Sequence, residues 1–552
     1  MKKFTLCIVL ISCSLLISAC SGSSGDSSAS KTPLLSLRLR QTSTESETKW
    51  RDTYQAISEN QGCCDEVWFA TGITIPPLDF HREHAEILSK AKQDLEQQNI
   101  ATALQIQMTI GHGDQLIEGI EKLFSNKTWG GWTGSTGVEA KYCNCPRQPE
   151  FLAYMQEMAA IYAPLRFRTI WIDDDLRYEN HKPATDGSLL GCWCETCIEA
   201  FNSEHNTKYT RETLSRAVAS DDVVAEQWWV FSVASLQNVA RVIAIEFLKV
   251  SPDTQLGLQH TSYDGHSRYQ DAIIKTLTEL NGKPALFRPG GGDYYDSTNA
   301  AGQISKSMQS ARHMVSMDNT NIQAWCPEIE SWPRVYGSRT AKSIQAEGFA
   351  ALAYGADAIS YFVVAGEKED ASVYSYSLLK PISEASDVLY KYKEANEGTR
   401  PVGYKVDVYT PELYEFGCSA MPVLPGEGKS LGELSSQDIV FNYTVETSKE
   451  IQARRQAIDD KCHTPVLCLS PYIGLVIPRV NDVGNVRTIA IINTRIDSQY
   501  KVKLRIDGYV KNAVWYEMRN KPIKLSITQD GDYSYVEIPE IDAWNCGFID
   551  LL

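Results

Sequence analysis

Residues 168–197 read RTIWIDDDLRYENHKPATDGSLLGCWCETC, and this stretch decides the predicted fold. Thr169–Ile172 combines β-branched and aromatic residues, which is typical of a buried strand. The chain then runs into Asp173, Asp174 and Asp175 without an intervening Gly or Pro, so their carboxylates should lie at the C-terminal end of the strand. In a (β/α)8 barrel, that end carries the catalytic residues. The alternative is that the three aspartates only cap the next helix or belong to a solvated loop.

Apolar strands alternate with amphipathic helices on both sides of this stretch. The expected strands are Leu35–Leu39, Val67–Thr71, Ala103–Met108, Thr169–Asp173, Leu256–His260, Ala285–Arg288, Ile322–Cys326 and Ala358–Val363. Helical stretches follow them, for example His81–Gln98, Glu150–Tyr162, Ala301–Val315 and Thr340–Tyr354. This alternation predicts an α/β fold, a (β/α)8 TIM barrel, over residues 34–400. A doubly wound sheet is the alternative, but no Gly-rich phosphate-binding turn follows the first strand.

The pattern changes after Arg400. Val402–Tyr409 resembles a strand and Ser436–Asp459 contains a helix, which predicts a small α+β unit over residues 401–478. Short alternating strands then predict a C-terminal β-sandwich over residues 479–552. They are Thr488–Ile492, Lys501–Ile506, Ala513–Met518 and Tyr535–Ile538.

The N-terminus has the pattern of an export signal. Lys2 and Lys3 precede a short apolar run that ends in Ser18-Ala19-Cys20, too short to span a membrane. This ending resembles a bacterial lipoprotein signal, which implies a signal peptide over residues 1–19, cleavage before Cys20 and a lipid on its thiol. The alternative is an ordinary signal peptide with an incidental cysteine. Residues 20–33 form a Ser/Gly-rich tether, so we expect an exported protein anchored to a bacterial membrane, facing the periplasm or the cell surface.

Composition restricts the class of partner. The chain has 552 residues, 43% of them hydrophobic and 10% aromatic, enough for one large domain and one or two smaller ones. Its net charge of −16 argues against nucleic acid, whose phosphates require a basic surface. A neutral, polar ligand fits better.

Polar and aromatic residues gather where the predicted strands end. Besides the aspartates of strand four, the strand ends and the loops after them carry Arg38, Arg40, His112, Asp114, Trp129, Trp132, Arg177, His181, His260, Arg288, Tyr294, Tyr295, Glu328, Glu330, Trp332 and Tyr361. Aromatic rings stack on sugar rings, while acids and arginines bind hydroxyl groups. Paired carboxylates also supply the acid and the nucleophile or base of glycoside hydrolysis. The pattern therefore predicts an oligosaccharide site, although any one of these residues could be structural.

Three patches resemble glycoside hydrolase family 42, the β-galactosidase-like barrels of the large retaining-glycosidase clan. One is Cys192-x-Cys194-x-x-Cys197 with Glu199-Ala-Phe-Asn202 after strand four. Another is Tyr142-Cys-Asn-Cys145-Pro146 after strand three. The last is Glu328–Trp332 with Ala353-Tyr-Gly-Ala-Asp357 leading into Tyr361-Phe362. The part after Arg400 is too short for the family's usual trimerisation domain.

The resemblance implies roles for three residues. Asp174 falls in the family's Asn slot, Asp175 in its acid/base Glu slot and Glu328 in its nucleophile slot. The chain departs from the family by having Asp-Asp instead of Asn-Glu, and an Asp places its carboxyl about one C–C bond further back. Asp175 is expected to be the protonated acid because Asp173 and Asp174 repel a further negative charge. Glu330, which shares a strand face with Glu328, is the rival nucleophile.

Four cysteines predict a structural metal site. Cys145, Cys192, Cys194 and Cys197 provide the four thiolates of a structural zinc, to which the family resemblance also points, and Cys143 could replace Cys145. Disulfides or free thiols are the alternative, because disulfides are allowed in an exported protein. No cofactor is expected for catalysis, since a four-thiolate site leaves no open position.

These patterns predict a lipid-anchored glycoside hydrolase acting on an oligosaccharide. The alternative from another class is a non-catalytic glycan-binding lipoprotein on the same barrel, which the Asp-Asp departure favours. A metal-dependent hydrolase using the aspartates with His112, His181 or His260 is the third possibility, but no closely spaced histidine pair supports it.

Overall fold

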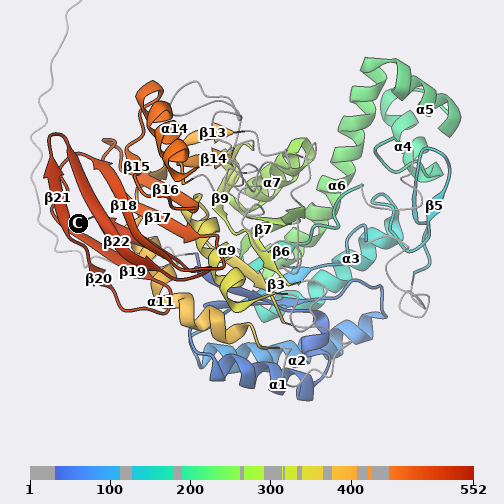
Figure 1. Cartoon of the computed structure of the whole chain (residues 1–552). Helices are drawn as coiled ribbons and strands as arrows, with labels where there is room; N and C mark the ends of the chain where they lie inside the picture. The colour runs from blue at the N-terminus through green and yellow to red at the C-terminus, as the bar shows by residue number, and fades with distance from the viewer. Residues whose placement is uncertain are drawn as a thin grey trace, which may run out of the picture. The chain divides into compact units, whose positions relative to one another are not determined.

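The computed structural model describes residues 32–111, 127–178, 189–261, 267–290, 314, 317–331, 339–364, 376–406, 420–425 and 447–551. Residues Pro33–Leu552 form one compact unit (Figure 1). Several sequence predictions lie outside the described residues: Cys20, His112, Asp114, His181, Tyr294, Tyr295, Trp332 and nearly all of the helix expected at Ala301–Val315.

A nine-stranded parallel sheet forms the barrel, in the order β10-β11-β1-β2-β3-β6-β7-β8-β9. The strands are β1 (Leu35–Arg38), β2 (Glu66–Ala70), β3 (Ala101–Ile106), β6 (Thr169–Ile172), β7 (Gln255–Thr261), β8 (Ala285–Gly290), β9 (Ile322–Trp325), β10 (Glu328–Glu330) and β11 (Ile359–Phe362). They read as apolar runs because parallel strands are buried on both faces.

The two outer strands of this order are halves of one strand. Only Cys326 and Pro327 separate β9 from β10, and proline interrupts the ladder because it has no N–H. β9 pairs with β8 while β10 pairs with β11, so the chain itself joins the two edges of the sheet. The barrel therefore has eight strands, and the predicted TIM barrel is confirmed.

Helices cover the outside of the barrel and its long loops. They are α1 (Glu47–Glu59), α2 (Leu78–Glu96), α3 (Pro149–Tyr162), α4 (Glu195–His205), α5 (Arg211–Ser220), α6 (Asp222–Val250), α7 (Ser267–Asn281), α9 (Ala341–Ala353) and α11 (Leu379–Ala395). Asp221 caps α6 by accepting from Val223 N at 2.9 Å. In the described part of the chain, α6 alone is long and apolar enough to cross a membrane, but 56% of its most apolar window is buried, as in a core helix.

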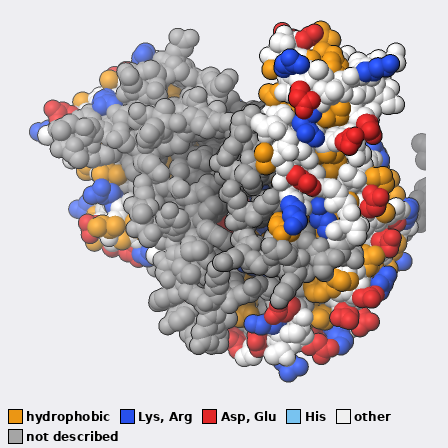
Figure 2. All heavy atoms as spheres, turned by 90° about the vertical axis from the view of Figure 1, so that its right-hand side faces the viewer, with side chains coloured by type: hydrophobic (Ala, Val, Ile, Leu, Met, Phe, Trp, Pro, Cys, Tyr) orange, Lys and Arg blue, Asp and Glu red, His pale blue; other side chains and the backbone are white. Residues whose placement is uncertain are grey.

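The loops after strands three and four pack together beside α6. β4 (Trp132–Thr133) and β5 (Glu139–Ala140) form a small antiparallel hairpin, and Trp193 N donates to Thr133 O at 2.7 Å. Figure 2 shows acidic and basic side chains interspersed over the described part of this side of the molecule. The negative net charge is therefore not gathered into one patch there.

Two antiparallel sheets form the predicted C-terminal β-sandwich. One has the order β12-β16-β17-β23-β19-β20 and the other β15-β18-β22-β21. The strands are β12 (Arg400–Pro401), β15 (Val466–Cys468), β16 (Gly474–Val480), β17 (Val486–Asn493), β18 (Gln499–Asp507), β19 (Ala513–Glu517), β20 (Ile523–Lys524), β21 (Ile527–Asp530), β22 (Tyr533–Ile541) and β23 (Cys546–Leu551). Side chains of both sheets, such as Ile491, Leu504 and Trp515, share one buried core.

The segment between barrel and sandwich holds a parallel pair, β13 (Tyr404–Val406) with β14 (Val423–Pro425), and the helix α14 (Ser448–Lys461). Thr447 and Glu450 begin α14 with a capping box. The sequence assigned residues 401–478 to the small α+β unit. In the structure this range includes β15 and the part of β16 up to residue 478. Arg479 connects the sandwich to the barrel by donating to Ala353 O at 3.1 Å, at the end of α9.

Candidate functional site

Arg38, the last residue of β1, bridges strands four and seven inside the barrel. Its Nη2 lies 2.8 Å from Asp173 Oδ1, and its Nη1 donates to Glu328 Oε2. All three side chains are at most 6% exposed. Burial lowers the pKa of Arg38, but the nearby carboxylates, Glu328 foremost, outweigh it and raise the pKa above its usual value. Arg38 is therefore a fixed cation between two strand-end acids.

Arg288 of β8 forms a second bridge. Its Nη1 lies 3.4 Å from Glu328 Oε2, and its Nη2 lies 3.9 Å from both Asp173 Oδ1 and Asp174 Oδ2. Gly290 makes room for this guanidinium, because a Cβ at that position would lie 2.0 Å from Arg288 Nη1 and 3.2 Å from Glu328 Oε1. Strand six therefore contributes to the same cluster.

Two buried glutamines connect Arg38 and Arg288 through hydrogen bonds. Gln105 Oε1 accepts from Arg38 Nε and, at 3.1 Å, from Gln259 Nε2. Gln259 Oε1 accepts from Arg288 Nη2 at 2.9 Å. The orientation of the Gln105 amide is set by its donation to Trp68 O at 3.2 Å and to Leu39 O at 3.3 Å. Both guanidinium groups are held in place before any ligand binds.

The three aspartates lie together, each with one carboxylate oxygen within 4.8 Å of the others. Arg177 lies against two of them, with Nη1 3.4 Å from Asp174 Oδ2 and Nη2 3.7 Å from Asp175 Oδ1. The Asp174 side chain is 17% exposed, whereas that of Asp175 is 0% exposed. Asp174 is thus the most accessible of the three.

Asp173 holds its proton more strongly than an ordinary aspartate does. Burial, followed by the negative charge of Asp174, raises the pKa of Asp173 to about 8, although Arg38 and Arg288 lower it. The described part of the cluster contains the carboxyls of Asp173, Asp174, Asp175, Glu328 and Glu330 against the guanidinium groups of Arg38, Arg177 and Arg288. This excess of carboxyls favours retention of a proton.

Some residues predicted for the site lie elsewhere. Trp129 is buried, donates to Asn144 Oδ1 at 2.8 Å and packs 5.7 Å from the ring of Tyr154. Trp132 is 1% exposed and lies in β4. Neither presents an open face as a sugar platform. His260 is fully buried in β7, with Nδ1 2.5 Å from Gln270 Nε2.

The prediction that Tyr361 belongs to the site is wrong, because side chains alternate along β11. Its hydroxyl points toward Gly348 of α9, where a Cβ would lie 2.3 Å away. The next residue, Phe362, faces the cluster instead, with its ring centroid 4.5 Å from Arg38 Cζ. Successive residues of a strand point to opposite sides, so Phe362 takes the position predicted for Tyr361.

Among the described residues, Gln105 and Phe362 are participants that sequence reasoning missed. A signal existed for Gln105, a single amide in the otherwise apolar strand ATALQI. A buried amide needs hydrogen-bond partners, which indicates a polar interior at that level of the barrel. Nothing in the sequence distinguishes Phe362 from a core residue.

The four predicted cysteines come together. Cys145 Sγ lies 3.4 Å from the Sγ atoms of both Cys194 and Cys197, and these sulfurs and that of Cys192 all lie within 4.8 Å of one another. None of the four forms a disulfide, because their sulfurs are too far apart for S–S bonds of about 2.05 Å. Four thiolates at about 2.3 Å from one zinc would have similar mutual spacing, so the donor set fits this ion. Cys143 is not in the group.

Comparison with known proteins identifies the fold. Neither a family model nor a curated protein sequence matches the chain. Among solved structures, a catalytic mutant of a GH42 β-galactosidase from G. stearothermophilus matches with a TM-score of 0.57 and 10% identity, covering 94% of this chain and 98% of that one. A β-galactosidase from Bacillus circulans sp. alkalophilus gives 0.53 and 9%, covering 95% and 99%.

An α-L-fucosidase isoenzyme from Paenibacillus thiaminolyticus gives a TM-score of 0.52 and 9% identity, covering 94% of this chain and 100% of that one. Such low identities establish the fold alone. The chain has the fold of these glycosidases along nearly its whole length, and the family 42 resemblance is confirmed at that level.

Proposed function

We propose that this protein is a glycoside hydrolase that cleaves a glycosidic bond in an oligosaccharide. Glu328 serves as nucleophile or base, and a strand-four aspartate, Asp175, serves as the acid. One observation carries the proposal: Arg38 and Arg288 each reach from the strand-four carboxylates to Glu328. The acids of strands four and seven therefore face the same barrel interior, as a catalytic pair must.

The arginines suit Glu328 to its role. Both contact Oε2, and two guanidinium groups stabilise negative charge on a buried carboxylate. Glu330, two residues further along β10, is the rival for this role.

The acid could come from either of two aspartates. Asp175 occupies the acid slot by resemblance to family 42, but its side chain is fully buried beside Arg177. Asp174 is partly exposed and lies 3.9 Å from Arg288. A general acid must reach the leaving oxygen, so substitutions at both positions are needed to assign the role.

A zinc ion at Cys145, Cys192, Cys194 and Cys197 and a lipid at Cys20 belong to the same proposal. The zinc would hold the loops after strands three and four together without taking part in the reaction. The lipid would anchor the exported protein to a membrane. A metal-dependent hydrolase has less support, because Arg38, Arg177 and Arg288 already lie against the aspartates that would have to bind the ion.

The test is hydrolysis of a panel of aryl glycosides that includes β-galactosides and α-L-fucosides, with proton NMR of the released anomer. We expect turnover on at least one substrate, lowered by orders of magnitude in Glu328→Gln and in one of Asp175→Asn and Asp174→Asn. Glu330→Gln is the matched control. Binding of oligosaccharides without hydrolysis by the wild-type protein would establish the non-catalytic alternative, and near-normal turnover of Glu328→Gln would refute its role.

A further inference from the structure

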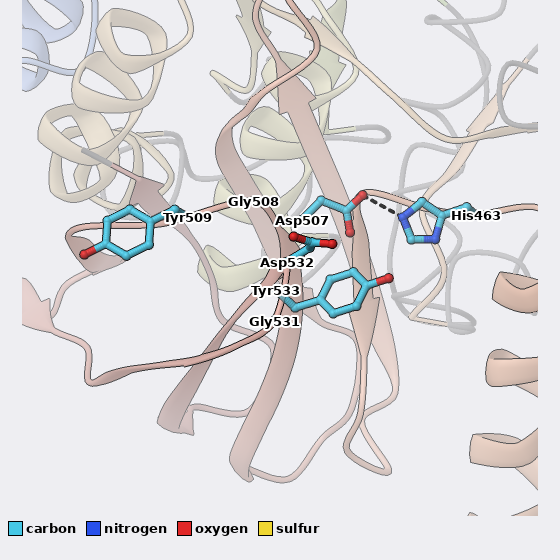
Figure 3. A pocket seen from close by; sticks show the side chains of 7 residues that line it. All are labelled: His463, Asp507, Gly508, Tyr509, Gly531, Asp532 and Tyr533. Carbon is cyan, nitrogen blue, oxygen red and sulfur yellow. Dashed lines mark hydrogen bonds and ion pairs between the residues drawn. The ribbon is translucent and has the colours of Figure 1, made fainter.

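A hollow of about 370 Å³ lies on the C-terminal β-sandwich, apart from the barrel carboxylates. Its lining residues are His463, Asp507, Gly508, Tyr509, Gly531, Asp532 and Tyr533 (Figure 3). The volume falls within the range of small-ligand sites, roughly 300–1,000 Å³. It is large enough for one sugar residue.

The backbone of this hollow is held in place. Asp507 ends β18 and pairs in register with Tyr533, which begins β22. Gly508 N donates to Asp532 O at 2.8 Å. Gly508 has a φ of +81° and Gly531 a φ of +58°, and no atom lies within 4 Å of a Cβ built on either. Both glycines are therefore needed for the left-handed turns rather than for space. These turns fix the shape of the hollow, and a preformed site loses little entropy on binding.

Its charged groups are mostly satisfied by one another. His463 Nε2 lies 2.7 Å from Asp507 Oδ2, and His463 Nδ1 lies 3.6 Å from Asp459 Oδ1. Arg505 Nη1 pairs with Asp459 Oδ2 at 2.6 Å. Asp532 is exposed and has no hydrogen-bond or ion-pair partner for its carboxylate within the described parts of the chain. Figure 3 shows that carboxylate between the ring of Tyr509 and the Asp507–His463 pair.

Two tyrosines flank these carboxylates. Tyr509 is 80% exposed, so nearly all of its ring is open to a partner. Tyr533 is half-buried, with its ring centroid 4.7 Å from Arg505 Cζ. An open aromatic ring provides an apolar platform for the C–H face of a sugar, and a neighbouring carboxylate accepts hydrogen bonds from its hydroxyls.

We propose that this pocket binds one neutral sugar residue of a glycan, with Tyr509 as the stacking platform and Asp532 as the main hydrogen-bond acceptor. Anionic sugars fit poorly, because Asp507 and Asp532 face the ligand. A metal ion fits poorly too: of the described residues, the sets of His, Cys, Asp and Glu close enough to hold one are the four cysteines and the three barrel aspartates. The pocket would keep the protein on a polysaccharide whether or not the barrel hydrolyses it.

Native affinity electrophoresis of the full chain tests this proposal. The gels contain galactan, arabinogalactan, xyloglucan, glucomannan or amylopectin as neutral probes and polygalacturonan as the anionic probe. We expect at least one neutral probe to retard the wild type, and Tyr509→Ala and Asp532→Asn to weaken that binding at least tenfold. Tyr500→Ala, which alters an exposed tyrosine of β18 outside the pocket (63% exposed), is the matched control and should bind normally.

Hydrolysis of an aryl glycoside separates the pocket from the barrel, since Tyr509→Ala and Asp532→Asn should leave it unchanged. The proposal is overturned if no neutral probe retards the wild type, or if only polygalacturonan does. It is also overturned if Tyr509→Ala and Asp532→Asn both bind like the wild type. Equal thermal midpoints of all variants show that a loss of binding is not a loss of folding.

Discussion

Arg38 and Glu328, 290 residues apart in the chain, form a buried ion pair through Arg38 Nη1 and Glu328 Oε2. The same guanidinium holds Asp173 at 2.8 Å. Two acids on different strands thus share their closest cation, which comes from a third strand, and this relationship makes the site testable without knowledge of the substrate.

Arg38→Met should destabilise the protein strongly, because it removes the closer of the two arginines that contact both buried acids, Asp173 and Glu328. Loss of one partner of a buried pair costs about 3–5 kcal/mol. Arg38→Lys keeps the charge but not the planar fork, so it should fall between wild type and Arg38→Met. Urea unfolding measures the effect. Arg82→Met is the control, since its pair with Asp79 is exposed and such pairs contribute about 0–1 kcal/mol; equal losses at Arg38 and Arg82 would contradict the prediction.

Gly290→Ala should impair the site without removing any functional group. The new Cβ would lie 2.0 Å from Arg288 Nη1, so the guanidinium must move away from Glu328. We expect its turnover to fall as far as that of Arg288→Met, and the double variant to be no worse than either single one, because both act through the same contact. Gly130→Ala, whose Cβ would meet only the end of the Gln148 side chain at 3.3 Å, is the control. Additive losses would show that Gly290 acts by another route.

The stability of the protein should respond to pH through Asp173. Burial raises the pKa of this group from 3.8 to about 8, so the folded state retains a proton that the unfolded chain releases. Its contribution to the free energy of unfolding is therefore fully present below about pH 4 and falls as the pH rises toward 8. Asp173→Asn, which cannot ionise, should flatten this dependence in urea unfolding between pH 5 and 8.5. The partly exposed Asp174→Asn serves for comparison, and an unchanged slope in Asp173→Asn would contradict the expectation.

Purified protein should contain near one zinc per chain by elemental analysis. Serine at Cys145 or Cys197 should remove the metal and lower the thermal midpoint, because each sulfur lies within 4.8 Å of the other three. Cys143→Ser is the matched control, as a buried cysteine of the same loop that lies outside the group. Absence of metal, or a mass that reports disulfides among the four cysteines, would rule the zinc site out.

Much of the fold could be predicted because a strand buried on both faces leaves a continuous apolar run in the sequence. The sequence predicted strand four at Thr169–Ile172 and its acids in the Asp173-Asp174-Asp175 run that follows. Glu328 was placed on strand seven in the same way. The break at Cys326 and Pro327, through which the chain joins the two edges of the sheet, was not predicted, because it depends on which neighbour each half of the strand pairs with.

The sequence by itself determined which acids, arginines and cysteines meet at the carboxyl ends of the strands, since parallel strands bring their ends to one edge. Only the tertiary structure decided how they pair. Asp173 acquires its raised pKa from burial and from the negative charge of Asp174. Phe362 replaces Tyr361 because strand parity sets which side chain faces Arg38. The thiolate group contains Cys145, as predicted, and not its possible substitute Cys143. Each of these outcomes depends on directions and distances between segments far apart in the chain, which no local pattern of residues encodes.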